Sequence, residues 1–224
     1  MMAPLRGRLA WIADAGMTAL LAMLGFTIFV VPIVAAPFGD AARTLVELFY
    51  VLVLLCGAWA IAEHRGIATL LAALAAAALA IAWLPLPGLG TMRPLLHEAA
   101  ALVAAIMLAA MVGVRVFSPG RITVDRIMGA VALYLLLGVA WGSAYEIVAQ
   151  VDANAFSAPV PGAGGVERWF YFSFVTLTTV GYGDVTPVAR AARVLAIGEA
   201  LVGQLYPAVV LARLVTLQAP PPAD

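Results

Sequence analysis

Long apolar runs separated by short polar turns dominate this sequence. Six runs carry few charged residues and are long enough to cross a bilayer core of about 30 Å, which takes roughly 20 helical residues. The six runs are residues 16–36, 44–62, 67–84, 95–117, 127–148 and 191–217. The turns between them are rich in proline, glycine and charged residues, as at 37–40 and 85–88. This pattern predicts an all-α membrane protein with six transmembrane helices.

A seventh apolar run, residues 169–178, lies between the fifth and the sixth and is too short to span a membrane. It is rich in aromatic residues. Non-helical backbone at membrane depth is tolerated only where protein buries it or a water-filled cavity lies beside it. We therefore expect a re-entrant helix here, followed by a non-helical segment.

The composition agrees with a membrane protein and argues against several soluble classes. Of the 224 residues, 65% are hydrophobic and 11% are charged, which is far from the usual soluble range. The 12 basic residues, all of them arginine, balance 12 acidic residues, so no net charge is present to attract nucleic acid. The single cysteine, Cys56, cannot form an intrachain disulfide, and its apolar surroundings indicate a small buried hydrophobe.

Two histidine-containing fragments raise the question of metal-dependent enzyme chemistry. His97 and Glu98 begin a metalloprotease-like pair, but no second histidine follows four residues after the first, so the zinc-binding pair is absent. His64 lies in a polar turn without a metal-ligand partner at a workable spacing. The sequence therefore predicts no enzyme activity and no cofactor.

Residues 178–184 read Thr-Thr-Val-Gly-Tyr-Gly-Asp and resemble the selectivity filter of the potassium channel superfamily, TVGYGD. In such a filter, successive backbone carbonyls point toward one axis and replace the water shell of a potassium ion. The ribbon alternates between left- and right-handed backbone regions, which glycine tolerates. The resemblance implies outward-turned valine and tyrosine side chains and a threonine hydroxyl at the inner mouth. It places the bound potassium ions at Thr179, Val180, Gly181, Tyr182 and Gly183.

The resemblance also implies an assembly and a division of the chain. One chain supplies one strand of the filter and a ring needs four, so we expect a homotetramer in a lipid bilayer. Residues 118–224 would form the pore domain, which consists of helix, pore loop, helix and a short proline-rich tail, and residues 1–117 would form four further helices. The pattern is similar to that of bacterial six-helix channels with a two-transmembrane-type pore domain. No regulatory domain is expected after residue 217.

The first four helices occupy the position that holds the voltage sensor in voltage-gated relatives, whose fourth helix carries an arginine at every third residue. The fourth run here, 95–117, has one arginine, Arg115, at its end. One charge feels about 2.3 kcal/mol per 100 mV, so a single arginine predicts weak voltage dependence. Glu47 and Glu98 lie within about a turn of a helix end and are expected to be interfacial carboxylates.

Several residues before and after the filter are expected to support it. Tyr171 lies where relatives place a tryptophan that bonds the aspartate following the filter, so its hydroxyl is expected to reach Asp184. Some two-span relatives carry a glutamate on the pore helix, but this chain has Val175 there, so no carboxyl pair forms. Trp169 and Phe170 fit two alternatives equally well, an aromatic cuff around the filter or anchoring at the membrane interface.

The last helix holds residues that the resemblance connects with gating. Gly203 matches the hinge glycine at which the inner helix bends, and Gln204 would then face the water-filled cavity below the filter. Pro207 removes a backbone hydrogen bond and is expected to kink the helix as well. Arg193 matches a basic residue near the outer start of this helix and is expected to be structural.

Glu199 is the one ionisable residue deep inside a predicted span, which makes it a candidate functional residue. Two interpretations stay open. In the first, its charge takes part in gating or attracts potassium. In the second, it is uncharged because it is buried, and it packs or hydrogen-bonds behind the pore helix. Candidate partners for the second are hydroxyls of the pore helix, such as those of Thr176 and Thr178, or the backbone of that helix.

Arginine distribution sets the expected orientation. Six spans place both termini on one side, and the short loops of that side hold a modest excess of arginine, which predicts cytoplasmic termini in the cell membrane. Two alternative functions were weighed. A non-selective cation channel usually replaces the filter tyrosine, which is present here as Tyr182. A potassium uptake transporter carries four divergent filter repeats in one chain, whereas this chain has one intact repeat.

Overall fold

The structure is a computed structural model of the chain, and it describes residues 16–35, 40–60, 66, 69–70, 72–73, 76–77, 80–81, 90, 92–119, 123–157 and 166–218. The helices in these residues are α2 (Gly16–Gly25), the π-helical η1 (Phe26–Val30), α3 (Val31–Ala35), α4 (Asp40–Ala60), α6 (Met92–Phe117), α7 (Val124–Val151), α8 (Val166–Leu177) and α9 (Arg190–Gln218). Within the same residues, β pairing is limited to one isolated bridge between Phe156 and Pro187. The all-α prediction is confirmed for the described part of the chain.

Four helical segments of the described chain are long and apolar enough to cross a membrane: Gly16–Val34, Met92–Phe117, Val124–Val151 and Arg190–Arg213. They coincide with the first, fourth, fifth and sixth predicted runs. The second run lies in α4, whose apolar stretch Thr44–Gly57 is shorter. Much of the third run, the polar turns at 37–39 and 85–88, the turn with His64 and the tail beyond 218 lie outside the described residues. A total of six spans therefore stays a prediction.

The first span contains a wide helical turn directly before a proline. Pro32 has no backbone N–H to donate, and its ring crowds the preceding turn. The chain meets this constraint with the π-helical turn of η1, at the end of which the Val31 N–H donates to the Phe26 carbonyl. Because the turn is widened, α2, η1 and α3 continue as one helical segment across Pro32.

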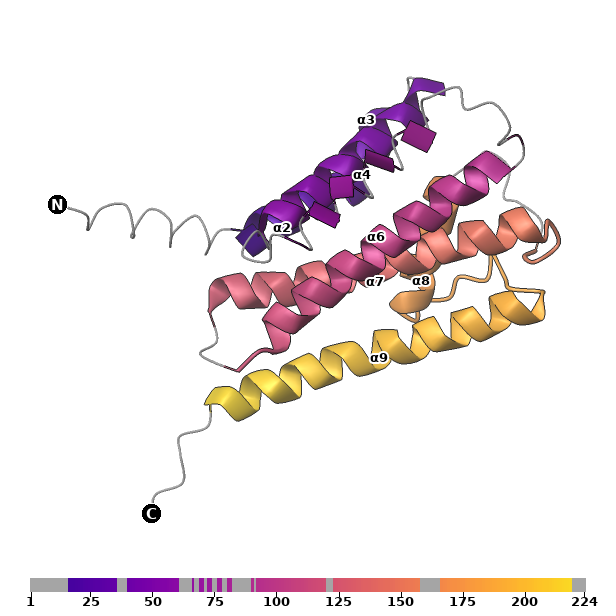
Figure 1. Cartoon of the computed structure of the whole chain (residues 1–224). Coiled ribbons are helices and arrows are strands. Elements are labelled where there is room, and N and C mark those ends of the chain that lie inside the picture. The colour runs from indigo at the N-terminus through magenta and orange to yellow at the C-terminus, as the bar shows by residue number, and fades with distance from the viewer. Residues whose placement is uncertain are drawn as a thin grey trace, which may run out of the picture.

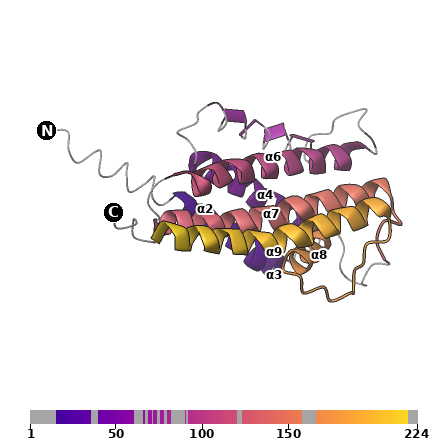
Figure 2. The ribbon, with the colours of Figure 1, turned by 90° about the horizontal axis from the view of Figure 1, so that it is seen from below.

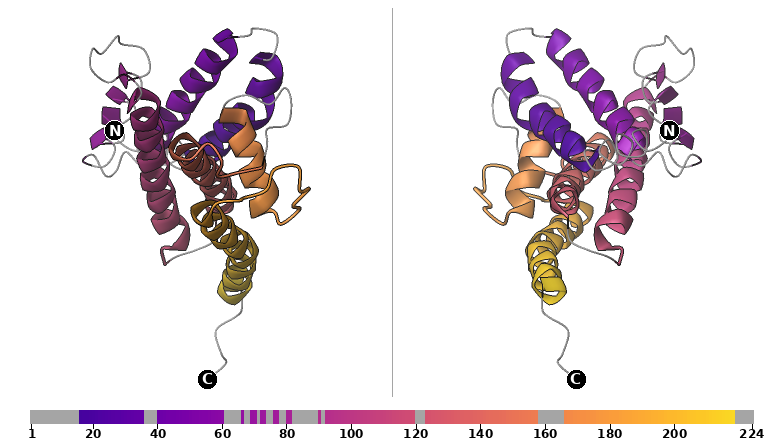
Figure 3. Two further views of the ribbon diagram at one scale, coloured as in Figure 1. Left: turned by 90° about the vertical axis from the view of Figure 1, so that its right-hand side faces the viewer. Right: turned by 90° about the vertical axis from the view of Figure 1, so that its left-hand side faces the viewer.

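The central element of the molecule is α7. It packs against α2 and α6 and also against α8 and α9. Figures 1 and 3 show α2 and α4 at one edge of the molecule, α9 at the opposite edge and α7 between them. In Figures 1 and 2, α7 and α9 run side by side in opposite directions. One helix therefore connects the first half of the chain to the second.

The main hydrophobic cluster is built almost entirely from aliphatic side chains of the first half and their neighbours on α7. Because lipid tails are as apolar as leucine, close packing rather than escape from water stabilises such a cluster in a membrane. Its fully buried members include Met17, Leu20 and Leu24 of α2, Val53 and Leu54 of α4, Leu108 and Val112 of α6, and Leu136 of α7.

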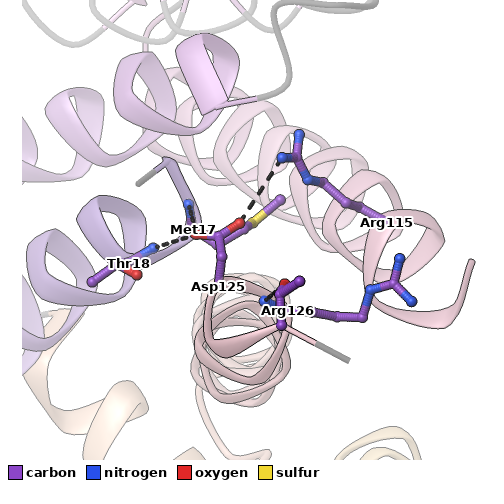
Figure 4. Close-up of polar contacts among 6 residues, drawn as sticks. Met17, Thr18, Arg115, Asp125 and Arg126 are labelled. Carbon is purple, nitrogen blue, oxygen red and sulfur yellow. Dashed lines mark hydrogen bonds and ion pairs between the residues drawn. The ribbon is translucent and has the colours of Figure 1, made fainter. Parts of the chain in front are cut away.

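A polar contact at one end of the molecule ties three helices together. Asp125, in the first turn of α7, accepts hydrogen bonds at Oδ1 from the backbone N–H groups of Met17 (3.1 Å) and Thr18 (3.3 Å), at the start of α2 (Figure 4). A carboxylate satisfies unpaired N–H groups at a helix start and interacts well with its partial positive charge. Arg115 of α6 lies 3.9 Å from the other carboxylate oxygen of Asp125. The one arginine of the fourth run is therefore part of a structural junction.

The prediction of an interfacial carboxylate is wrong for Glu98. This residue lies in α6, is only 3% exposed, and has the imidazole Nδ1 of His97 at 3.6 Å from its Oε1. The carboxyl group is buried because Glu98 lies on the same face of α6 as the buried residues Ala101, Ala105 and Leu108. The side chain of Glu47 lies outside the described residues.

Candidate functional site

The short helix α8 packs against both α7 and α9 (Figure 1). Its seat on α7 depends on two glycines one turn apart. A Cβ at Gly138 would lie 2.6 Å from Cε1 of Phe174, and a Cβ at Gly142 would lie 2.4 Å from Cδ1 of Phe170. Because no side chain fits at such distances, glycine at both positions lets the two aromatic rings of α8 rest directly on the backbone of α7.

Residues 178–184 leave the end of α8 as a non-helical ribbon with an alternating backbone. The φ angle is positive at every second residue, with 59° at Thr179, 57° at Gly181 and 81° at Gly183. Within the described chain, Thr179 is the one non-glycine residue with a positive φ. A β-branched residue rarely adopts this region, so the ribbon holds Thr179 in a strained conformation of the kind found at functional sites.

The first amides of the ribbon turn back to the end of α8. The N–H groups of Val180 and Gly181 both donate to the carbonyl of Val175, at 3.0 and 3.3 Å. The Thr179 N–H donates to the Thr176 carbonyl at 2.9 Å. These bonds occupy the first amides of the ribbon and do not use the carbonyl oxygens of residues 179–183. The C-terminal end of a helix carries about half a negative charge, so the end of α8 favours a cation nearby.

The segment after the ribbon is fixed to the segment that follows α7. The Ser157 N–H donates to the Thr186 carbonyl, and the Val188 N–H donates to the Ala155 carbonyl, both at 2.8 Å. The Ser157 hydroxyl oxygen in turn accepts from the Thr186 N–H at 2.8 Å. The ribbon is therefore anchored at both ends, by α8 before it and by residues 155–157 after it.

An aromatic cluster surrounds this anchor. Trp169 is 6% exposed, and its ring centroid lies 4.5 Å from that of Phe156. Phe172 and Tyr145 complete the cluster, with ring centroids 4.8 Å apart. Trp169 therefore packs inside the protein, against Phe156 of the segment that holds the ribbon. The two alternatives, a cuff around the filter and anchoring at the membrane interface, stay predictions. Phe170 is half-buried.

Tyr171 and Asp184 form the contact that the sequence predicts. The Tyr171 hydroxyl donates to Oδ2 of Asp184 at 2.8 Å. Tyr171 is 42% exposed in the single chain, and Asp184 is exposed as well. The bond joins α8 to the outer end of the ribbon. Its effect on the ribbon stays a prediction.

Glu199 is fully buried in α9 and meets two hydroxyl groups from two other helices. Its Oε2 lies 2.5 Å from the Tyr145 hydroxyl of α7, and its Oε1 lies 2.5 Å from the Ser173 hydroxyl of α8. A partner on the short helix was expected, but the named candidates were wrong. The carboxyl group bonds Ser173, closer to the start of α8, while the Thr178 hydroxyl donates to the Phe174 carbonyl.

The three residues that the family resemblance connects with gating lie near the middle of α9. Gly203 is buried against the end of α8, where a Cβ would lie 1.8 Å from the Leu177 carbonyl oxygen. Gln204 is exposed, and its side-chain amide donates to Oγ1 of Thr179 at 2.8 Å. Pro207 lies inside α9, which continues through it as one helix to Gln218 (Figure 1). The helix is therefore not interrupted at Pro207, and the kink expected there stays a prediction.

Arg193 and the question of a metal site remain from the sequence analysis. Arg193 donates from Nε to the Pro187 carbonyl at 3.3 Å, which agrees with a structural role. The part of the chain that the structure describes has no group of three or more histidine, cysteine, aspartate or glutamate side chains placed to hold a metal ion. The ribbon offers a cation oxygen atoms of another kind, among them its backbone carbonyls and the Thr179 hydroxyl.

Comparison with known proteins gives matches to the same region. The family model described as "Ion channel" matches residues 161–218, which hold α8, the ribbon and α9. Protein LctB of Bacillus caldotenax is 37% identical over 123 residues, which cover 51% of this chain and 90% of that protein. Protein LctB of Geobacillus stearothermophilus is 35% identical over 100 residues, 42% of this chain and 74% of that protein.

A plant protein matches a smaller share of its own length. Two-pore potassium channel 1 of Arabidopsis thaliana is 36% identical over 94 residues, which are 40% of this chain and 23% of that protein. No solved structure shows significant similarity to the chain.

The apolar helices and the family matches define a multi-pass membrane protein that acts as an ion channel rather than as an enzyme. Within that class, the chain belongs to the potassium channel superfamily.

The sequence reasoning missed four residues that position the site. Ser173 and Tyr145 bond the buried carboxyl group, and Gly138 and Gly142 seat α8 on α7. A signal for the glycines was present, because two glycines four residues apart in an apolar helix are typical of close helix packing. Ser173 and Tyr145 gave no such signal, since single hydroxyl residues in apolar runs are common and their partners come from distant parts of the chain.

Proposed function

We propose that this protein is a potassium-selective channel in which four identical chains form one filter. The observation that carries the proposal is the ribbon 178–184, whose TTVGYGD sequence coincides with a positive φ at residues 179, 181 and 183. Alternation of this kind turns successive carbonyls toward the same side. A ring of such ribbons offers a dehydrated potassium ion the oxygen atoms that replace its water shell.

The surroundings of the ribbon support cation conduction. The amides of Val180 and Gly181 bond back to α8 through the Val175 carbonyl, and the carbonyls of residues 179–183 would then face the pore. The partial negative charge at the C-terminal end of α8 stabilises a cation that has lost its water. Thr179 adds its hydroxyl oxygen at the inner mouth, where Gln204 contacts it. The side chains of Tyr171 and Asp184 would brace the outer end.

A tetramer is supported by the apolar surface that the single chain exposes. Val180 is 54% exposed and Tyr182 is 71% exposed, although both belong to an anchored segment. On α9, large apolar side chains are exposed at regular spacing: Val194 63%, Ile197 62%, Leu201 58% and Leu205 60%. Exposed apolar surface of this extent indicates contact with protein or lipid. Around a central pore, these faces of α9 and the ribbon would meet neighbouring chains.

The proposal includes the arrangement of the chain in the cell membrane. Residues 118–224 would form the pore domain, with α8 as the re-entrant pore helix, α7 as the outer helix and α9 as the inner one. Residues 1–117 would form a four-helix domain, which gives six spans and cytoplasmic termini. Gly203 would be the hinge of the inner helix, and Pro207 would ease bending because the Gly203 carbonyl has no helical N–H partner there.

Rubidium uptake into proteoliposomes tests the proposal. Purified protein in potassium-loaded vesicles should drive uptake of rubidium, an ion close to potassium in size, and external sodium should compete weakly. Gly181→Val gives the matched negative control, because valine is disfavoured at a φ of 57°. Equal competition by sodium and rubidium would contradict potassium selectivity and favour a non-selective cation channel.

A further inference from the structure

Three fully buried polar side chains meet at one point between α7, α8 and α9. Tyr145, Ser173 and Glu199 are each 0% exposed in the single chain, so no neighbouring chain is needed to bury them. The carboxyl group lies 2.5 Å from each hydroxyl. The Ser173 hydroxyl also lies 2.7 Å from the backbone carbonyl of Gly138. Three short oxygen–oxygen contacts therefore share this small space.

Each of these contacts needs a proton between its two oxygens, and the two hydroxyl groups supply only two. The Tyr145 proton serves the contact with Oε2. The single Ser173 proton serves either the Gly138 carbonyl or Oε1 of Glu199. If Glu199 is ionised, one pair of oxygen atoms at 2.5–2.7 Å repels without a proton. If Glu199 is protonated at Oε1, it donates to Ser173, Ser173 donates to Gly138, and every contact has its proton.

We infer that Glu199 is a neutral acid that donates a hydrogen bond to Ser173 and thereby fastens α9 to α8 and α7. Ser173 belongs to α8, the helix that leads into the ribbon, so the contact with Glu199 holds α9 against the helix behind the proposed filter. Glu199 acts through Ser173 and Tyr145 and does not reach the ribbon itself, so it is a positioning residue. No ion pair with a basic side chain is involved in these contacts.

The contacts between α9 and α8 follow one another at intervals of one helical turn. Glu199 faces Ser173, and one turn further along each helix Gly203 faces Leu177. The hydrogen-bonded network therefore ends one turn before the proposed hinge. If the proposed function holds, the network keeps the outer half of α9 against α8 while the inner half bends from Gly203 onward. Movement of the inner gate would then leave the filter undisturbed.

Infrared spectroscopy of the purified full-length protein tests the position of the proton without any ion flux. Wild-type protein at neutral pH should show the carbonyl stretch of a protonated carboxyl group, and ¹³C-labelled glutamate should shift this band. In Glu199→Gln the band should be lost, while Glu98→Gln, which changes another buried carboxyl group, should leave the Glu199 band in place. A band that is unchanged in Glu199→Gln, or its absence from wild type, would overturn the inference.

Flux assays test the fastening itself. The amide of Glu199→Gln donates to Ser173 and accepts from Tyr145 as the neutral acid does, so its rubidium uptake should match wild type. Glu199→Ala leaves the Tyr145 hydroxyl without its acceptor, and it removes the contact through which Ser173 joins α8 to α9. It should lower uptake about tenfold or more, in line with the cost of unsatisfied buried groups. Equal loss in both variants would mean that the charge matters and would overturn the inference. If both variants match wild type, the fastening has no effect on conduction and is likewise rejected.

The two proposals fail in different ways. The inference on Glu199 rests on the proposed function for its effect on conduction, but the infrared band does not depend on which ion passes. A channel that fails to discriminate potassium from sodium and still shows the band would reject potassium selectivity and keep the neutral carboxyl group. A selective channel without the band would do the reverse.

Discussion

The first and second halves of the chain are held together by different kinds of contact. In the main hydrophobic cluster, the buried side chains of α2, α4 and α6 are aliphatic or methionine, and one such side chain replaces another at moderate cost as long as the volume is kept. Around α8, positions are fixed by glycine gaps, paired hydroxyl groups and a backbone with positive φ, which few substitutions reproduce. Similar hydrophobic patterns along the chain thus correspond to one region that tolerates many substitutions and to another that tolerates few.

Substitution of a glycine at a close helix contact should have the largest effect on conduction and stability, and it tests the contrast between the two halves. Gly203→Ala places a Cβ 1.8 Å from the Leu177 carbonyl oxygen, a contact that only a shift of α9 against α8 relieves. We expect loss of rubidium uptake and a less stable tetramer on size-exclusion chromatography. A Cβ at Gly25 would meet open space, with no contact within 4 Å, so Gly25→Ala is the control and should conduct as wild type does. Normal uptake by Gly203→Ala would show that α9 does not need this close contact.

The second largest effect is expected where the aromatic rings of α8 pack on the glycines of α7. Gly142→Ala brings a Cβ within 2.4 Å of the Phe170 ring. Overpacking of this kind costs about 1–3 kcal/mol, which should lower the thermal unfolding temperature of the purified protein. The double variant Gly142→Ala with Phe170→Leu should recover part of the loss, because the smaller side chain makes room. Failure of the second substitution to restore any stability would count against the seating contact.

The helices and the ribbon were predictable from the sequence, whereas the partners of individual buried side chains were not. The apolar runs at 16–36, 95–117, 127–148 and 191–217 predicted the helical segments found at 16–34, 92–117, 124–151 and 190–213, because long hydrophobic segments have few alternatives in a membrane. The filter motif predicted the ribbon through the family resemblance, and its glycines permit the alternating backbone. The partners of Glu199 and the burial of Glu98 depend on how helices rotate against one another, which periodicity alone leaves open. For the same reason Thr176 and Thr178 were the wrong partners.

A milder effect is expected at the outer end of the ribbon. Tyr171→Phe removes the hydroxyl that donates to Asp184 at 2.8 Å and keeps the ring. Because both side chains are exposed in the single chain, the fold should keep its thermal stability, and the change should appear in open probability or inactivation. Tyr145→Phe, which removes a hydroxyl from the buried network instead, serves as the comparison and should also reduce stability. Single-channel kinetics of Tyr171→Phe identical to wild type would show that the bond has no functional role.

The smallest effect is expected when the membrane voltage is changed and the conductance is measured. Arg115 is the one arginine in the fourth apolar run, and it lies 3.9 Å from Asp125 at the junction with α7. With so little charge to move through the field, conductance–voltage curves should be shallow, and Arg115→Gln should change their slope hardly at all while loosening the junction. A steep curve equivalent to several gating charges per tetramer would contradict the structural role given to Arg115.

The central claim is that four ribbons of residues 178–184 form a potassium-selective filter, and a bi-ionic reversal potential tests it most directly. Single-channel currents should be recorded in planar bilayers with potassium on one side and an equal concentration of sodium on the other. The account predicts a reversal potential far from zero, displaced toward the potassium equilibrium potential, because carbonyl oxygens replace the water shell of potassium better than that of sodium. A reversal potential near zero would contradict it.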